Sequence, residues 1–187
     1  QTKNMKKIIA LAVLVIATTG LVQAQMYKDK TCKVSFYSHT ALEDISAVDT
    51  TGTMLLNTKT NDVIAQVMIK GFIFPNGLMQ EHFNENYMES DKYPKSTFKG
   101  KINEKVDYTK DGTHNVTITG NLEVHGVTKP RTLPATITIK GGVITVDLKF
   151  NIALKDHEIK VPEAVGAKIA ENIEVTVHTV MVQPGKK

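Results

Sequence analysis

The sequence predicts an all-β protein, folded as an antiparallel eight-stranded barrel with one or two short helices. Apolar and polar residues alternate along several segments of about ten residues, which is typical of strands that bury one face. The helical segments are too short to cover a sheet, and the chain shows neither βαβ spacing nor an internal repeat. The sheet must therefore bury its apolar face against itself, in a barrel or, as the alternative, in a two-sheet sandwich.

The alternation is clearest in the second half of the chain. From Val143 to Ala153, the apolar residues at even positions are expected to face the interior, with Asp147 and Lys149 outside. Residues 132–140 repeat this pattern, and Gly141-Gly142 between the two segments suits the positive φ angles of a tight hairpin. The expected strands are 31–38, 44–56, 62–69, 96–108, 115–124, 132–140, 143–153 and 173–182, with a bulge or bend at Gly120.

Two segments have the features of short helices. Residues 78–84 follow the Pro75-Asn76-Gly77 turn, and residues 162–170 begin with a proline, which suits the first turn of a helix. Neither segment is long enough to form a layer of its own.

Residues 1–24 are expected to be a signal peptide, which leaves 25–187 as one domain. Lys6-Lys7 provides the positive region, residues 8–16 the apolar region, and Val22-Gln23-Ala24 a small-residue cleavage site. The apolar run is shorter than the ~20 residues of a membrane-spanning helix, although a retained membrane anchor is the alternative. The expected location is therefore periplasmic or secreted, with no stable membrane insertion after removal of the leader.

Charge and cysteine content exclude several classes of protein. The chain has a formal net charge of +4, but without residues 1–24 it retains 20 basic and 19 acidic residues, a balance of +1. Because the lysines alternate with acids along the chain, no nucleic-acid partner is expected. Cys32 is the only cysteine, so no disulfide can form within the chain, and we expect it to be a small apolar strand residue.

No catalytic or metal-binding residues are predicted, and no cofactor. The six histidines show no metal-ligand spacing, and no nucleophile elbow or phosphate-binding loop occurs. Asp156-His157-Glu158 is interpreted as a solvated turn, because adjacent residues of an extended segment point to opposite faces. The residues give no positive argument for an enzyme, and an enzyme acting on a lipid or small molecule is the third-ranked function.

Aromatic and methionine side chains concentrate in residues 72–88. Two compatible roles are open to them: they plug one end of the barrel, or they line the mouth of an apolar pocket, where flexible methionines adapt to a ligand. The residues concerned are Phe72, Phe74, Leu78, Met79, Phe83, Tyr87 and Met88.

Two blocks of sequence resemble the YceI-like family of bacterial polyisoprenoid-binding proteins. Residues 83–102, F-N-E-N-Y-M-E-S-D-K-Y-P-K-S-T-F-K-G-K-I, are similar to the segment that follows the family's early strands. Residues 120–129, G-N-L-E-V-H-G-V-T-K, are similar to its G-x-L-x-x-x-G-V-T-K turn. The resemblance covers roughly residues 30–182, nearly all of the chain after the leader.

This resemblance implies a lipocalin-like barrel that encloses an isoprenoid or a comparable long-chain amphiphile. The expected function is an exported lipid-binding protein that transports, stores or sequesters such a molecule, and a homodimer is left open. The alternative is a structural or interaction module whose barrel is filled by its own side chains. The candidate lipid-pocket residues are Phe36, Phe72, Phe74, Leu78, Met79, Phe83, Tyr87, Met88, Phe98, Leu148, Phe150 and Ile152.

Overall fold

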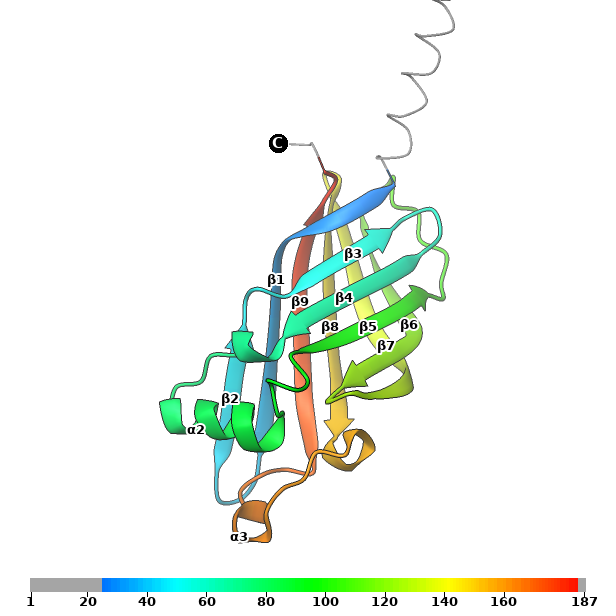
Figure 1. The fold of residues 1–187 in the computed structure, drawn as a ribbon. Helices are drawn as coiled ribbons and strands as arrows, with labels where there is room; N and C mark the ends of the chain where they lie inside the picture. The colour runs from blue at the N-terminus through cyan, green and yellow to red at the C-terminus, as the bar shows by residue number, and fades with distance from the viewer. Residues whose placement is uncertain (1–24, 185–187) are drawn as a thin grey trace, which may run out of the picture.

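A closed antiparallel β-barrel forms the body of the protein (Figure 1). The computed structural model describes residues 25–184, so the expected signal peptide lies outside the described residues. The strands are β1 (Met26–His39), β2 (Asp44–Asp49), β3 (Thr53–Asn57), β4 (Asp62–Met68), β5 (Lys95–Ile102), β6 (Gly112–Val124), β7 (Val127–Lys140), β8 (Val143–Ala153) and β9 (Asn172–Val182).

Eight of these strands close the ring, which confirms the predicted barrel. Consecutive strands pair from β3 to β9, and β1 joins the two ends by pairing with both β3 and β9. β2 lies outside the ring and pairs only with the second half of β1. Beyond β2, the sheet continues only as a single bridge between Val48 and Ile73.

The predicted alternation in β8 is confirmed. Ile144, Val146 and Leu148 are buried, whereas Asp147 and Lys149 are exposed. The predicted hairpin between β7 and β8 is also present, with φ values of 58° at Gly141 and 77° at Gly142. Positive φ at both positions matches the right-handed twist of the strands on either side.

The sequence-based prediction of one strand over 44–56 is wrong, because the chain turns between β2 and β3. The Asp49 carboxylate accepts hydrogen bonds from the Thr51 amide at 2.6 Å and from its hydroxyl at 3.1 Å. Such a local bond offers the backbone an alternative to the ladder. The strand predicted over 96–108 ends early, at Ile102, and a loop follows in which Glu104 binds the amide of Thr117.

No bulge occurs at Gly120, so the first of the two irregularities expected there, a bulge or a bend, is absent. The register of β6 with both neighbours is continuous through this residue, which lies directly opposite Gly100 of β5. A Cβ atom at Gly120 would collide with the backbone of Lys99 and Gly100, so the two glycines permit a close approach of the strands. The irregularity lies instead in β1, between Asp29 and Thr31.

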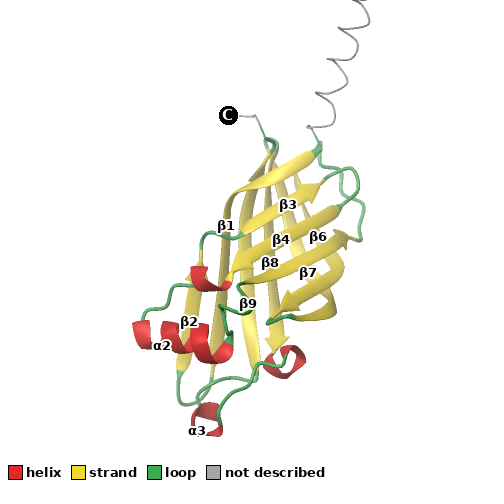
Figure 2. Ribbon diagram, in the orientation of Figure 1, coloured by secondary structure: helices red, strands yellow, loops and turns green. Residues whose placement is uncertain are grey.

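The helices gather at one end of the barrel (Figure 2). The predicted helix over 78–84 is present as α2 (Gly77–His82), which continues into a π-helical turn, η2 (Phe83–Tyr87). The helix predicted over 162–170 is reduced to a single turn, α3 (Glu163–Gly166). Two 3₁₀ turns, η1 (Ile69–Gly71) and η3 (Leu154–His157), complete the set, and none of the helices in the described part could cross a bilayer.

The strand ladder is interrupted twice at this helical end. β7 pairs with β8 only from Ala135 onward, so its first half, which contains Pro130 and Pro134, has no β8 partner. Proline lacks an amide donor and is tolerated where a ladder is incomplete. The second interruption lies between β2 and the ends of β4 and β5 that are nearest the helices, because β2 does not pair with either strand. The segment from η1 to η2 covers this gap in the ladder (Figure 1).

Side chains fill the opposite end of the barrel. Ile139, Ile144 and Met181 are adjacent across β7, β8 and β9, and all three are buried. A smaller cluster of Ala47, Phe72 and Phe74 packs between β2 and the helical segment. The barrel therefore has one end filled by core residues and one end closed by loops and short helices.

Candidate ligand-binding site

An apolar cavity of about 490 Å³ lies inside the helical end of the barrel. The inward residues of β8 and β9 that line it are those toward this end, including Leu148, Phe150, Val175 and Val177. Ile144 and Met181, farther along the same strands, belong to the filled end and do not contact the cavity. A cavity of this size and character is typical of sites for small apolar molecules.

Four phenylalanine rings close the side of the cavity where the ladder is interrupted. Phe83 in η2 stacks on Phe36 of β1, with ring centroids 5.3 Å apart. It also contacts Phe72 at 5.8 Å and Phe74 at 5.0 Å. Contacts at these separations stabilise beyond simple burial, so the cluster holds the segment from η1 to η2 against the barrel.

Local hydrogen bonds shape the segment that carries Phe83. The Asn76 side chain caps α2 by accepting from the amides of Leu78 at 2.9 Å and Met79 at 3.3 Å. Gln80 Oε1 accepts from the amide of Phe74 at 3.1 Å, which fixes the turn that precedes the helix. The Pro75-Asn76-Gly77 sequence thus both starts the helix and directs its apolar face to the cavity.

All twelve candidate pocket residues lie on the cavity wall. Phe36, Phe98, Leu148, Phe150 and Ile152 come from the barrel strands, and the others from the helical segment. The structure therefore brings together residues that are widely separated in the sequence. The members from the helical segment are Phe72, Phe74, Leu78, Met79, Phe83, Tyr87 and Met88.

Sequence reasoning missed several apolar wall residues. Ala65 of β4 and Met54 of β3 line the cavity, and neither was among the candidate pocket residues. Leu122 and Val124 of β6 also line the cavity, but nothing in the sequence distinguished the cavity end of this strand from its filled end. Cys32 also lines the cavity, and its predicted role as a small apolar strand residue is confirmed by its burial in β1.

The depth of the cavity carries no charge near neutral pH. Burial raises the pKa of the Cys32 thiol to about 11, with a hydrogen bond to Thr179 opposing the shift. Burial also raises the pKa of the Tyr87 hydroxyl. Both groups therefore stay protonated, and the interior suits an uncharged apolar chain.

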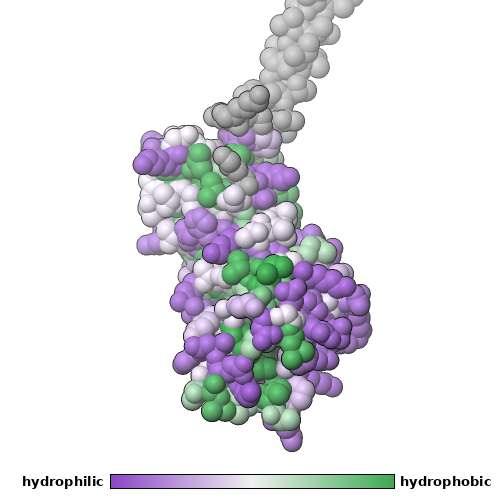
Figure 3. Space-filling view, turned by 90° about the vertical axis from the view of Figure 1, so that its left-hand side faces the viewer, coloured by the Kyte–Doolittle hydropathy of each residue, from purple (hydrophilic) through white to green (hydrophobic). Residues whose placement is uncertain are grey.

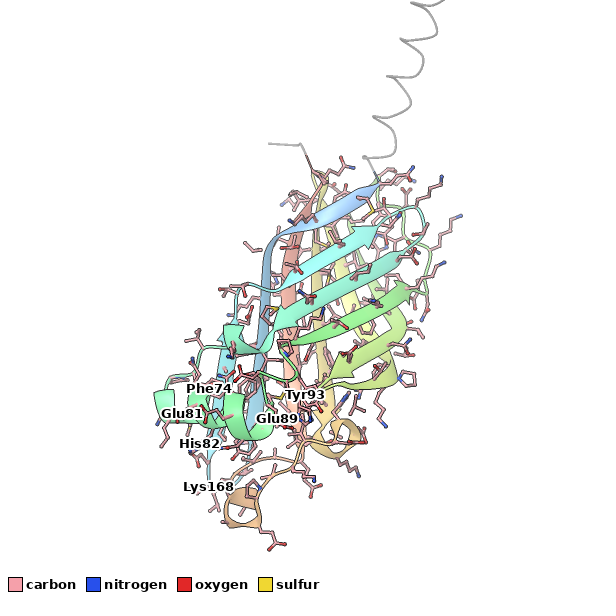
Figure 4. The ribbon with its side chains drawn as sticks, in the orientation of Figure 1. Phe74, Glu81, His82, Glu89, Tyr93 and Lys168 are labelled. Atoms are coloured by element: carbon pink, nitrogen blue, oxygen red, sulfur yellow. The ribbon has the colours of Figure 1, made fainter. Side chains whose placement is uncertain are left out.

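Charged groups occur only around the mouth, where the β1–β2 turn, α2 and the segment after α3 meet. Lys168 Nζ lies 3.5 Å from Glu43 Oε2, and both residues line the opening together with His82. Figure 4 shows His82 and Lys168 on the same side of this end of the barrel. The site thus combines an apolar interior with a polar rim.

His157 lies in η3, where the sequence predicted a solvated turn. That interpretation is wrong for His157, which is 0% exposed and fills the space where β7 lacks its β8 partner. Its Nδ1 atom lies 3.0 Å from the carbonyl oxygen of Val127. Burial lowers the pKa of His157, so the ring is neutral and donates from Nδ1.

Within residues 25–184, no three His, Cys, Asp or Glu side chains are grouped so as to hold a metal ion.

The fold and cavity define a class of protein, a closed antiparallel barrel with an apolar pocket at one end. The model of the YceI-like domain matches residues 28–181, and the chain belongs to this family. No curated protein sequence matches the chain at a significant level.

Solved structures share this fold. A polyisoprenoid binding domain from Saccharophagus degradans, implicated in plant cell wall breakdown, aligns with a TM-score of 0.72 and 12% identity, over 84% of this chain and 98% of that one. BcnA of Burkholderia cenocepacia aligns with a TM-score of 0.67 and 16% identity, over 80% and 95%. The YCEI protein of Campylobacter jejuni aligns with a TM-score of 0.53 and 20% identity, over 80% and 85%.

Proposed function

We propose that this protein binds a polyisoprenoid or similar long-chain amphiphile, with the chain in the barrel and the polar head at the rim. The cavity of about 490 Å³ is the observation that carries this proposal. It also argues against the alternative of an interior filled by side chains. The polyisoprenoid-binding domain of Saccharophagus degradans, which shares the fold, gives further support for this choice of ligand.

The apolar wall supplies enough free energy for useful affinity. Burial of apolar surface stabilises by ~25 cal/mol per Å², so ~400 Å² of buried ligand would contribute ~10 kcal/mol before the costs of association. No reacting group is needed for this role. The proposed location is the periplasm or the outside of the cell, where the protein would transport, store or sequester its ligand.

Extraction of the purified protein, followed by mass spectrometry, tests the proposal directly. We expect a long-chain amphiphile to accompany protein prepared from its native host without detergent. Ligand-free protein should then be titrated with isoprenols of increasing length. Affinity should rise with chain length until the cavity is full and then level off. If no amphiphile is extracted and no isoprenol binds, the proposal is wrong.

A further inference from the structure

The charges on the cavity wall are paired with each other at the mouth. Apart from the exposed His82, the only ionic side chains among the described residues that line the cavity are Glu43 and Lys168, which lie 3.5 Å apart. The Lys168 side chain is 55% exposed and that of Glu43 28%, so the carboxylate is the more buried member of the pair. Figure 3, which views the side of the molecule that carries β2 and α2, shows hydrophilic side chains among hydrophobic ones over the helical end.

Hydrogen bonds hold the backbone of Glu43 in the turn between β1 and β2. The Glu43 amide donates to the Thr40 hydroxyl at 3.1 Å. The Glu43 carbonyl accepts from the Thr40 amide and from its hydroxyl, both at 3.1 Å. The turn thus keeps Glu43 at the mouth, with its carboxylate paired to Lys168 of the segment after α3.

Ser38 supplies a buried polar group at the same end of the cavity. It is 2% exposed, lines the cavity and pairs across the ladder with Ile45, two residues after Glu43. Its Oγ atom accepts from the Ala170 amide at 2.9 Å. A hydroxyl can accept one hydrogen bond and donate another. Within residues 25–184 no acceptor is found for the Ser38 proton, so this donor is available to a ligand.

We infer that this mouth selects an amphiphile with an uncharged oxygen head, a hydroxyl or carbonyl group that accepts from Ser38, and disfavours a phosphate or carboxylate head. The inference rests on the proposed function and names the class of head group. An uncharged oxygen satisfies the buried donor without bringing a net charge to the apolar interior. An anionic head at Ser38 would face the Glu43 carboxylate, whereas the charge of Lys168 is already paired and largely in water.

Farnesol and farnesyl phosphate test the inference, because they share one apolar chain and differ in the charge of the head. In calorimetric titrations of the full chain, farnesol should bind at least about tenfold more tightly, since repulsion between neighbouring like charges is worth at least that factor. Equal affinities would overturn the inference. Tighter binding of farnesyl phosphate would also overturn it, and would make Lys168 the receptor of an anionic head.

Glu43→Gln separates the charge of the head from its size. This variant removes the carboxylate and keeps the shape of the side chain, so the affinity for farnesyl phosphate should rise about tenfold while that for farnesol stays unchanged. The matched control is Glu174→Gln, which removes the acid of another lysine pair, with Lys149 at 2.8 Å, away from the cavity wall. It should change neither affinity. An unchanged ratio of the two affinities in Glu43→Gln would contradict the inference.

Ser38→Ala tests the hydrogen bond to the head. It should weaken farnesol binding by about five- to tenfold, the usual worth of one such bond. The binding of farnesene, an apolar chain of the same length without the oxygen, should not change. Because the Ala170 amide loses its acceptor in this variant, thermal unfolding is measured alongside, and retained farnesene binding shows that the cavity is intact. Equal loss of both ligands would mean that Ser38 acts only through the fold, which contradicts the inference.

The same titrations separate failure of this inference from failure of the proposed function. If farnesol, farnesyl phosphate and farnesene bind the unmodified chain with equal affinity, the cavity holds the chain but does not select the head. The proposed function then stands and the inference is wrong. If none of the three binds, both are wrong.

Discussion

A hydrogen bond joins His125 and Glu89, with 2.9 Å between His125 Nε2 and Glu89 Oε2. The other ring nitrogen, Nδ1, lies 3.1 Å from the carbonyl oxygen of His157. Each ring nitrogen of His125 thus lies within hydrogen-bond distance of an oxygen atom. The pair fastens the segment after η2 to the β6–β7 turn, and Tyr93 packs edge-on against the His125 ring at 4.5 Å.

Glu89→Gln should therefore destabilise the fold by about 1–2 kcal/mol, because it replaces the carboxylate that lies within hydrogen-bond distance of the buried His125 ring by a neutral amide. Because the side chain of Glu89 is half-exposed, the loss of stability should be smaller than for a fully buried pair. Urea denaturation monitored by circular dichroism measures the change. Lys92→Gln is the control, since it removes an exposed partner 3.9 Å from Glu89 and a cation–π contact with Tyr93 but leaves the bond between His125 and Glu89 in place. A larger effect at Lys92 than at Glu89 would contradict this account.

The buried His157 should make stability depend on pH. Burial lowers its pKa in the folded state, whereas the unfolded chain keeps the ordinary value near 6.5. The unfolded state therefore binds more protons as the pH falls below about 6.5, and stability should decrease until the folded pKa is reached. His157→Asn, which retains a donor for the Val127 carbonyl, should lack this part of the pH dependence. Parallel denaturation midpoints for the two proteins between pH 8 and 5 would disprove the prediction.

Phe83→Ala should weaken the binding of long isoprenols more than that of short ones. Phe83 contacts Phe36, Phe72 and Phe74 and forms part of the cavity wall, so its removal takes apolar contact from the ligand. Phe83→Leu, which keeps an apolar side chain, should restore most of the affinity. Calorimetric titration checks the ratio of long-chain to short-chain affinity. An unchanged ratio in Phe83→Ala, at intact folding, would show that this ring does not contact the ligand.

Val146→Asp should destabilise the barrel by several kcal/mol, because it buries a carboxylate without a partner. Val146 is 3% exposed and lies between Ile137 and Thr179 on the neighbouring strands. Lys149→Ala, three residues further along β8, removes an exposed ion pair with Glu174 and should cost no more than about 1 kcal/mol. Similar denaturation midpoints for the two variants would rule out the inward orientation of Val146.

The strands of the second half of the chain could be predicted because burial alone sets their register. In β8, a shift by one residue would place Asp147 and Lys149 inside and Ile144 and Leu148 outside. The break between β2 and β3 could not be predicted, because it depends on how the Asp49 carboxylate bonds to Thr51 once the turn forms. The burial of His157 depends on the missing β8 partner of β7, which no local pattern reveals.

The aromatic part of the cavity wall was visible in the sequence because its residues are concentrated in one segment. Phe150, one of its partners in the strands, was placed by alternation. The polar rim of the cavity could not be predicted from the sequence. Glu43 and Lys168 are separated by more than a hundred residues in the sequence, and only closure of the barrel brings them within 3.5 Å.

The pairing of β1 with β9 has a consequence for how the chain acquires its shape during synthesis. The first and last strands of the sheet meet in nine residue pairs, so the ring stays open until β9 has emerged from the ribosome. Until then, β1 and β8 expose unpaired backbone groups, which are prone to association with other chains. Contacts between such distant residues also form late and slowly. A chain interrupted before β9 would therefore have every aromatic residue of the pocket and yet no enclosed space in which to hold a ligand.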